Sequence, residues 1–327
     1  MRGETEQQQP RAVESLAIEP RAMEFRAVEP RSAEPLAVVP TPGEPPVAKP
    51  PVAVRRAYAS DLTDEQWALA LEQLPPAPGG GRPRTVNLRE VVNAIFYRLR
   101  TGCAWEMWPH DFPPRSTVSE YFIRWSKTGV IERLHDALRV AVRTQAGREP
   151  TASAAILDSQ SAKTTETRGE RGYDAGKKVK GRKRHILVDT LGLLIAVVIT
   201  VASVQDRDGA RLVFAAALGE TRLEKIWADG GYAGKLVEST RRDFGWDLEI
   251  VKRSDDMTGF VVRPHRWIVE RTFGWLGRFR RMGREHEATL TSSRSDVHLC
   301  LTHIMLRRLT RPPHQPHENE HRLAHIA

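Results

Sequence analysis

Residues 184–202 read RHILVDTLGLLIAVVITVA, and this stretch does most to decide the fold. Its apolar, β-branched residues fall into two runs around an Asp-Thr-Leu-Gly turn, which predicts a β-hairpin. Outward from the hairpin, SAAILDSQ at 153–160, EKIWAD at 224–229 and DLEIVK at 247–252 are apolar runs of strand length. DGARLVFAAAL at 208–218 has the spacing of a helix. Strands and helices in this order predict an α/β domain with a mixed sheet.

A helical region precedes this domain. Thr63 and Gln66 form a capping-box pattern at the start of one helix, and apolar residues at helical spacing predict a second helix over 88–101. Ser116 is expected to cap a third helix. These short helices and their basic residues suit a helix-turn-helix-like DNA reader and equally a plain packing or dimerising bundle, and spacing alone does not choose between them.

The two ends of the chain have a different composition. From Pro10 to Pro40 a five-residue repeat recurs, and its regular prolines are incompatible with helix or strand. The histidines after residue 311 stand in a polar, proline-containing tail, which favours a solvated segment over a metal site. The predicted organisation is a disordered Pro/Ala/Glu-rich extension (1–55), a small all-helical domain with a candidate DNA-binding role (56–147), an α/β domain (148–310) and a disordered tail (311–327).

Charge and composition restrict the class of protein. The 327 residues include 50 Lys and Arg against 41 Asp and Glu, and because residues 1–55 are slightly acidic, the excess lies in the part expected to fold. This excess favours a polyanionic partner, with a solubility role as the alternative. The longest apolar run is about half of a membrane span, and the N-terminus lacks a secretory signal. Two widely separated cysteines exclude a disulfide scaffold. We therefore expect a cytoplasmic protein.

Two acids follow short apolar strands. Asp158 follows AAIL and Asp229 follows KIWA. Each is expected at the C-terminal end of its strand, where an open α/β sheet presents ligands, and each is followed by small polar residues that let other groups approach. A single such Asp is more often a helix cap or turn former. Two at matched positions favour a functional pair.

A third candidate acid lies in an arginine-rich helical segment. Glu270 shares one helical stripe with Arg266. Between Arg263 and Arg284 there are seven arginines and this single acid, so most of these arginines lack a local partner. They and the basic loop 168–184, for which a solvated loop is the alternative, are expected to contact phosphates. The candidate DNA-binding residues are Lys177, Lys178, Lys180, Arg182, Lys183, Arg184, Arg263, Arg266, Arg271, Arg278, Arg280 and Arg281.

Three carboxylates suit metal-assisted attack on a phosphodiester. Carboxylate oxygens bind hard cations, and Mg²⁺ takes one or two carboxylates together with substrate phosphate. Two Mg²⁺ ions about 3.5 to 4 Å apart activate the attacking oxygen and neutralise the charge that develops. Asp158, Asp229 and Glu270 are thus the predicted catalytic residues and metal ligands, with Mn²⁺ able to substitute for Mg²⁺.

Several motifs together resemble the DDE transposases of bacterial insertion sequences. ILDSQS, ADGGYAG and RWIVERTFGWLGRFRR carry the resemblance, together with VQDRDGA and GYDAGKKVKGRKRHILVDTLGLL. The similarity extends over residues 58–309 and is greatest to the five group of the insertion-sequence four/five superfamily. It implies a catalytic domain of the ribonuclease H-like fold, with Asp158, Asp229 and Glu270 as its three catalytic acids.

The sequence departs from that family around the third acid. The family signature has a Tyr, an Arg four positions before the Glu, and a Lys seven positions after it. Arg266 and Glu270 match, whereas Arg263 stands at the Tyr position and Gly277 at the Lys position, with Arg278 the nearest cation. We interpret this as a variation in which arginine takes over the phosphate contact.

The resemblance implies a transposase that binds the ends of an insertion element, cleaves DNA by metal-activated water and joins the 3′-hydroxyl ends to target DNA. It implies double-stranded DNA as partner, a homodimer in a synaptic complex, no membrane, and association with the nucleoid. The alternatives are a catalytically inactive, transposase-derived DNA-binding protein and a stand-alone ribonuclease H-like nuclease. Asp206 and Asp208 are rival acids, of which Asp208 is expected to cap a helix and Asp206 is left open. Tyr232 is not expected to act as a nucleophile.

Overall fold

The computed structural model describes residues 55–76, 85–166, 169–251 and 265–311. The predicted extension and tail lie almost wholly outside these ranges. Arg263 also lies outside them. Chain contacts place the described residues in one compact unit. The boundary between the helical and α/β domains at residue 147 stays a prediction. In the ranges that are described, no helix is both long enough and apolar enough to cross a membrane.

Helices form the first part of this unit. The capping box of Thr63 and Gln66 is confirmed at the first helix. Ser116 does not cap the third helix, because Pro114 occupies the N-cap position and Ser116 already lies in the first turn. The elements are α1 (Asp64–Leu71), α2 (Leu88–Thr101), the short η1 (Trp105–Met107), α3 (Arg115–Lys127) and α4 (Val130–Gln145).

A mixed six-stranded sheet follows, as predicted. Its order is β2-β3-β1-β5-β6, with β4 also paired to β3. The predicted hairpin is the antiparallel pair β3–β4, whereas β1 pairs in parallel with β5, and β5 with β6. The three-residue β2 was not predicted, since it lies in a glycine-rich loop. The strands are β1 (Ala154–Lys163), β2 (Gly172–Asp174), β3 (Val179–Asp189), β4 (Leu194–Val201), β5 (Lys225–Ala228) and β6 (Asp247–Ile250).

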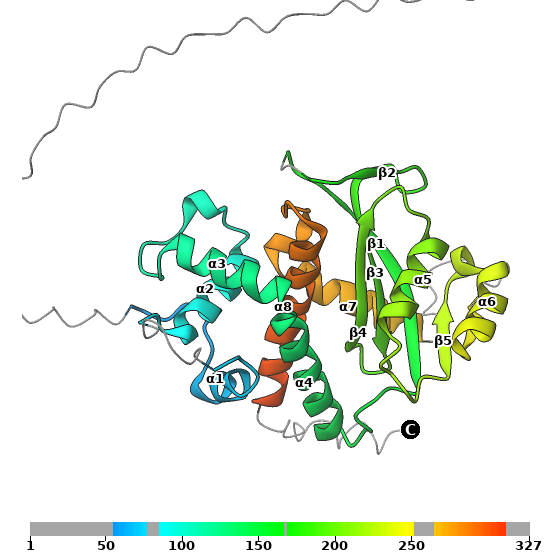
Figure 1. The fold of residues 1–327 in the computed structure, drawn as a ribbon, viewed down its shortest axis with the longest axis horizontal. Helices are drawn as coiled ribbons and strands as arrows, with labels where there is room; N and C mark the ends of the chain where they lie inside the picture. Colours follow the sequence, from blue (N-terminus) through cyan, green and yellow to red (C-terminus); the bar gives the residue numbers. More distant parts are fainter. Residues whose placement is uncertain (1–54, 77–84, 167–168, 252–264, 312–327) are drawn as a thin grey trace, which may run out of the picture. The chain divides into compact units, whose positions relative to one another are not determined.

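Helices cover both faces of the sheet (Figure 1). Helices α5 (Asp206–Ala216) and α6 (Lys235–Phe244) pack on one face, where Leu157 of β1 belongs to their apolar cluster. Its neighbour Ile156 belongs to the cluster of the other face, which is covered by the two helices that close the described chain. The remaining elements are η2 (Gly230–Tyr232), α7 (Arg266–Gly277), η3 (Arg280–Gly283) and α8 (Leu290–Leu309).

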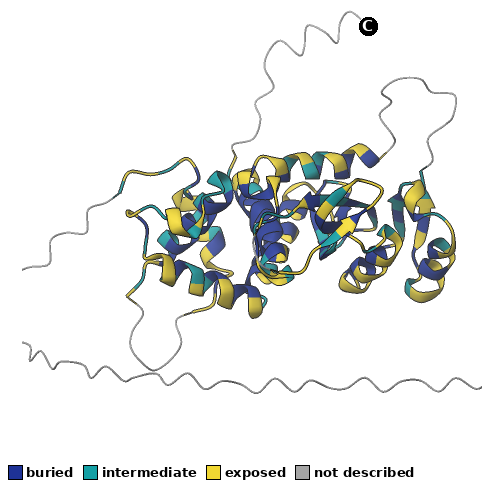
Figure 2. Ribbon diagram, turned by 90° about the horizontal axis from the view of Figure 1, so that it is seen from above, coloured by how far each residue is buried: buried dark blue, intermediate teal, exposed yellow. Residues whose placement is uncertain are grey.

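Helix α8 lies between the N-terminal helices and the sheet (Figure 1). One apolar cluster runs from Phe96 of α2 and Leu134 of α4, through Leu301 of α8, to Val197 of β4. Figure 2 shows buried residues concentrated in this interior and exposed residues along the outer helix faces. The N-terminal helices therefore share a core with the α/β part.

Candidate active site

The pairing of β1 with β5 brings the first two predicted acids level with each other. In this parallel pair, Ala154 lies opposite Lys225, and each further pair keeps the same offset. Asp158 and Asp229 differ in number by that same offset, so they lie side by side just past the last pair. Asp229 directly follows β5, as predicted. The prediction that Asp158 ends its strand is wrong, because β1 continues to Lys163 while paired with β3.

A buried arginine joins the two carboxylates. Arg266, the first residue of α7, has Nη2 3.2 Å from Oδ2 of Asp158 and Nη1 3.4 Å from Oδ2 of Asp229. Side chains alternate between the faces of a strand, so Asp158 shares the α7 face with Ile156. The Nε of Arg266 has no hydrogen-bond partner among the described residues. Two of the three predicted acids and the predicted arginine therefore converge.

The electrostatics of the pair favour a positive charge. Burial raises the pKa of Asp158, and the neighbouring Asp229 raises it further, while the Ser159 amide and Arg266 act in the opposite direction. Oδ1 of Asp158 accepts a hydrogen bond from the Ser159 amide at 2.7 Å. Oδ1 of Asp229 accepts one from the Gly231 amide at 2.8 Å. These backbone donors fix both carboxylates while leaving each second oxygen directed toward the arginine.

Glu270 lies one turn beyond Arg266 on α7, and its side chain is exposed. Its side chain makes no hydrogen bond or ion pair with any other residue that the structure describes. Within the described ranges, no three His, Cys, Asp or Glu side chains form a group that could hold a metal ion. The structure thus does not bring Glu270 into contact with the aspartate pair, and its role stays a prediction.

The donor set of the pair nevertheless suits a hard divalent cation. Two carboxylates lie side by side, and the guanidinium of Arg266 stands between them as a positive charge. Carboxylate oxygens are preferred ligands of Mg²⁺, which needs only one or two of them when substrate phosphate completes its shell. Asp158 and Asp229 are therefore the residues that could hold a cation here.

The rival acid Asp206 lies on the opposite face of the sheet. Its Oδ1 accepts a hydrogen bond from Ser159 Oγ at 2.8 Å and lies 3.0 Å from Lys183 Nζ. Because Asp158 and Ser159 are consecutive in a strand, their side chains point to opposite faces. The sheet therefore separates Asp206 from the aspartate pair.

Two further predictions concern residues near this face. Asp208 was expected to cap α5, but Gln205 is the N-cap and the helix begins two residues before Asp208, so that prediction is wrong. Tyr232 is only 1% exposed, and burial raises its pKa well above the ordinary value. A buried, protonated phenol is a poor nucleophile, which agrees with the expectation for Tyr232.

Four of the residues that the sequence assigned to DNA are buried and paired with acids. Arg182 and Arg184 both pair with Glu285, at 3.6 and 3.5 Å. Lys183 points to the other face and pairs with two aspartates, and Arg281 pairs with a buried glutamate and a buried aspartate. These side chains are not available to a phosphate backbone, because they are buried and acids of the same chain neutralise them. The prediction that these four residues bind DNA is therefore withdrawn.

The other candidate DNA-binding residues differ from these four. Arg266 is committed to the aspartate pair, and Arg263 lies outside the described residues. Arg271 is half-buried, has Trp267 and Trp275 within cation–π distance, and donates to the carbonyl of Leu191 at 3.0 Å. The exposed candidates are Lys177, Lys178, Lys180, Arg278 and Arg280.

Sequence reasoning missed the acids that neutralise the buried arginines. Glu285 and Glu287 lie in the segment that follows η3, and both are buried. Their spacing of two residues resembles that of Arg182 and Arg184, and side chains two apart in extended chain share a face. The two segments are not paired residue for residue, because Glu285 pairs with both arginines of β3 while Glu287 pairs with Arg98 and Arg281.

Comparison with known proteins finds similarity to transposases in both the helical part and the α/β part of the chain. A family model described as the transposase DDE domain matches residues 149–306. A second model, described as the putative transposase of the IS4/5 family, matches residues 62–135. A putative transposase for insertion sequence element IS402 of Burkholderia cepacia is 32% identical over 126 residues, covering 36% of this chain and 57% of the relative. The chain thus spans somewhat more than half the length of that curated relative.

Proposed function

Because the chain belongs to the DDE transposases of the IS4/5 family of insertion sequences, we propose that it acts on DNA in transposition. It binds the ends of its element, cleaves the DNA with activated water and joins the freed 3′-hydroxyl to target DNA. Double-stranded DNA is the proposed substrate, and a homodimer that handles both ends is the proposed assembly. The observation that carries the proposal is the bridging of Asp158 and Asp229 by Arg266.

Asp158 and Asp229, with Glu270, are the proposed ligands of Mg²⁺ ions. When bound, these ions would activate the attacking water or hydroxyl and neutralise the charge that develops on the phosphate. Arg266 orients the two aspartates toward one another. Glu270, exposed one helical turn away, is the proposed third acid, reaching the pair by side-chain movement when DNA and metal bind.

The proposal is tested by single substitutions in a plasmid carrying the element ends. Asp158→Asn and Asp229→Asn should reduce cleavage below about 1% of wild type, since each removes a charge that holds the ion. Binding to element ends should persist. Glu270→Gln tests the third acid in the same assay. Asp208→Asn is the matched control, because it removes an exposed carboxylate on the opposite face of the sheet.

Three outcomes would contradict the proposal. Wild-type cleavage rates in Asp158→Asn or Asp229→Asn would refute the site. An equal loss in Asp208→Asn would show that the effect is not specific to the pair. A wild-type protein that binds the ends without cleaving them, at any concentration of Mg²⁺ or Mn²⁺, would refute the enzymatic proposal and favour the catalytically inactive alternative.

A further inference from the structure

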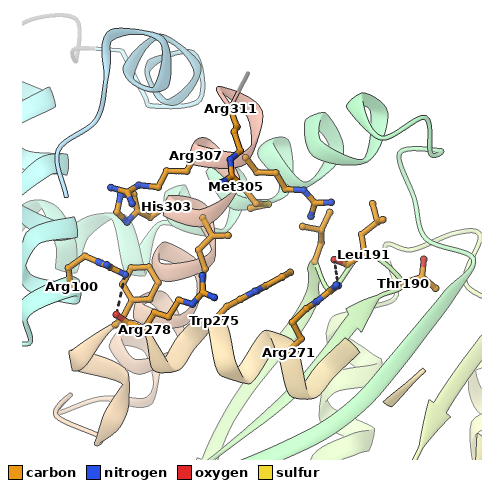
Figure 3. Close-up of a pocket in the computed structure, with 14 residues that line it drawn as sticks. Arg100, Thr190, Leu191, Arg271, Trp275, Arg278, His303, Met305, Arg307 and Arg311 are labelled. Atoms are coloured by element: carbon orange, nitrogen blue, oxygen red, sulfur yellow. Dashed lines mark hydrogen bonds between the residues drawn. The ribbon is translucent and has the colours of Figure 1, made fainter. Parts of the chain in front are cut away.

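A second basic feature lies beyond the aspartate pair, in a cavity of about 620 Å³ bounded by α2, the β3–β4 turn, α7 and α8. Figure 3 shows the side chains that line it, which come from segments far apart in the sequence. Its wall includes the apolar residues Trp275, Phe279 and Met305. The six arginines of the cavity, here called the cavity arginines, are Arg100, Arg271, Arg278, Arg307, Arg308 and Arg311.

The cavity arginines have no acid beside them in the described cavity wall, although Asp189 acts on Arg271 from outside it. Among the described residues that line the cavity there is no Asp or Glu. Arg100 donates to the carbonyl of Arg278 at 3.1 Å, and Arg271 and Arg307 likewise donate to main-chain carbonyls. Carbonyl oxygens satisfy N–H groups without cancelling the positive charge. The contacts of the arginines therefore leave a concentrated charge in the cavity.

The pKa values of Arg271 and Arg307 are lowered chiefly by burial, with a further contribution from a neighbouring arginine. Burial lowers the pKa of Arg271 and the neighbouring Arg308 lowers it further, while Asp189 acts in the opposite direction. Burial also lowers the pKa of Arg307, with Arg100 adding to the effect. Like charges held together in a partly desolvated cavity are relieved by an anion. The geometry and the charge thus indicate a missing polyanionic ligand.

We infer that this cavity binds the phosphate backbone of duplex DNA outside the position where cleavage takes place, an inference that rests on the proposed function. The labelled arginines surround the cavity without converging on one point (Figure 3), an arrangement better suited to several successive phosphates than to one. Guanidinium groups bind phosphates through paired N–H donors, and backbone contacts of this kind position DNA without reading its sequence.

Helix α7 connects the cavity to the aspartate pair. Arg266 at its start contacts both aspartates, and Arg278 at its C-cap lines the cavity. At about 1.5 Å of rise per residue, these two positions are roughly 18 Å apart along the helix. Successive base pairs are about 3.4 Å apart, so this length corresponds to roughly five base pairs. A duplex running along α7 would place a reacting phosphate at the aspartate pair and the flanking backbone at the cavity.

The test compares two pairs of adjacent arginines, and each pair lies in the last turn of its helix. Arg307 and Arg308 lie in the last turn of α8, and Arg241 and Arg242 lie in the last turn of α6, away from the cavity. The double variant R307A/R308A should bind a random-sequence duplex at least tenfold more weakly than wild type at about 0.1 M salt. Because each lost phosphate contact reduces the slope of log K against log salt by about 0.9, that slope should fall by nearly 2.

The variant R241A/R242A carries the same change of charge and should keep the wild-type slope. Arg308→Glu alone, which preserves the Arg307 contact with the Ala59 carbonyl, gives a second variant should the double one unfold; it should bind more weakly than wild type with an unchanged melting temperature. Equal slopes for wild type and R307A/R308A would overturn the cavity assignment while leaving the cleavage proposal standing. A wild type that binds no duplex would overturn both.

Discussion

The arginines of strand β3 and those of the α7–α8 cavity come from equally basic stretches of sequence, but their surroundings differ completely. Arg182 and Arg184 are 1% exposed and paired with Glu285, and Arg98 is fully buried beside Asp296. In the cavity, Arg100 and Arg271 meet main-chain carbonyls and aromatic rings, with no carboxylate in the wall that the structure describes. Density of arginine therefore does not by itself identify a nucleic-acid surface.

The difference lies in acids supplied from elsewhere in the chain. A buried guanidinium is tolerated only when a partner compensates for its lost hydration. Segment 285–296 provides those partners for the buried arginines Arg98, Arg182 and Arg184 and none for the cavity arginines. The buried arginines should consequently contribute to folding stability, and the cavity arginines to DNA binding.

The largest expected effect comes from Arg98→Ala. Arg98 pairs with Asp296 at 3.0 Å and also with Glu287, and its removal leaves these buried carboxylates with incomplete compensation. We expect a loss of about 3 to 5 kcal/mol in the free energy of unfolding, measured by urea denaturation. Arg124→Ala is the control, since Arg124 forms an exposed pair with Glu120 and should lose less than about 1 kcal/mol. Similar losses in both variants would show that the buried arginine contributes no more to stability than the exposed one.

A smaller effect concerns His303, which is buried beside the cavity. Burial lowers its pKa to about 3, and the positive charges of Arg307 and Arg100 contribute. The unfolded chain binds this proton near pH 6.5 and the folded protein does not, so stability is lost as pH falls from about 6.5 toward 3. Between pH 7 and pH 5 this histidine should account for a loss of about 2 kcal/mol.

His303→Gln provides the check on that prediction. Glutamine does not titrate, so the free energy of unfolding of this variant should vary less with pH by about 2 kcal/mol over the same interval. Denaturant unfolding at pH 5, 6 and 7 measures the difference. Parallel curves for wild type and variant would mean that the pKa of His303 is not lowered in the folded protein.

The smallest expected effect on stability comes from Arg308→Ala. Arg308 is exposed, and its side chain makes no hydrogen bond or ion pair with the other described residues. Its loss should change the free energy of unfolding by less than about 0.5 kcal/mol, measured by thermal denaturation. A destabilisation comparable to that of Arg98→Ala would show that the two groups of arginines are alike, contrary to the comparison.

The sequence predicted the elements that carry the site better than the surroundings of its side chains. Apolar runs before Asp158 and Asp229 predicted the strands, and their parallel pairing then placed the two acids together. The contribution of Arg266 was predicted through its helical spacing from Glu270, but not its position between the aspartates. That contact depends on how α7 packs on the sheet, which local spacing does not determine.

Burial of Arg182, Lys183 and Arg184 could not be predicted from the charge run alone. Alternation along β3 sends the two arginines to one face, where both pair with Glu285, and the lysine to the other, where it pairs with Asp206. A long-range ion pair leaves no trace in the composition of either segment. The same holds for Asp206, which sequence proximity left as a rival acid and which the sheet separates from Asp158.

The constant offset between β1 and β5 sets how this protein could change in length during evolution. The chain between the two strands can gain or lose residues in its surface connections, because ladder hydrogen bonds hold the acids level regardless of the path between them. A single inserted residue between Ala154 and Asp158 would instead turn the carboxylate to the α5 side. Related chains should therefore accumulate insertions in the loops and almost none within these few strand positions.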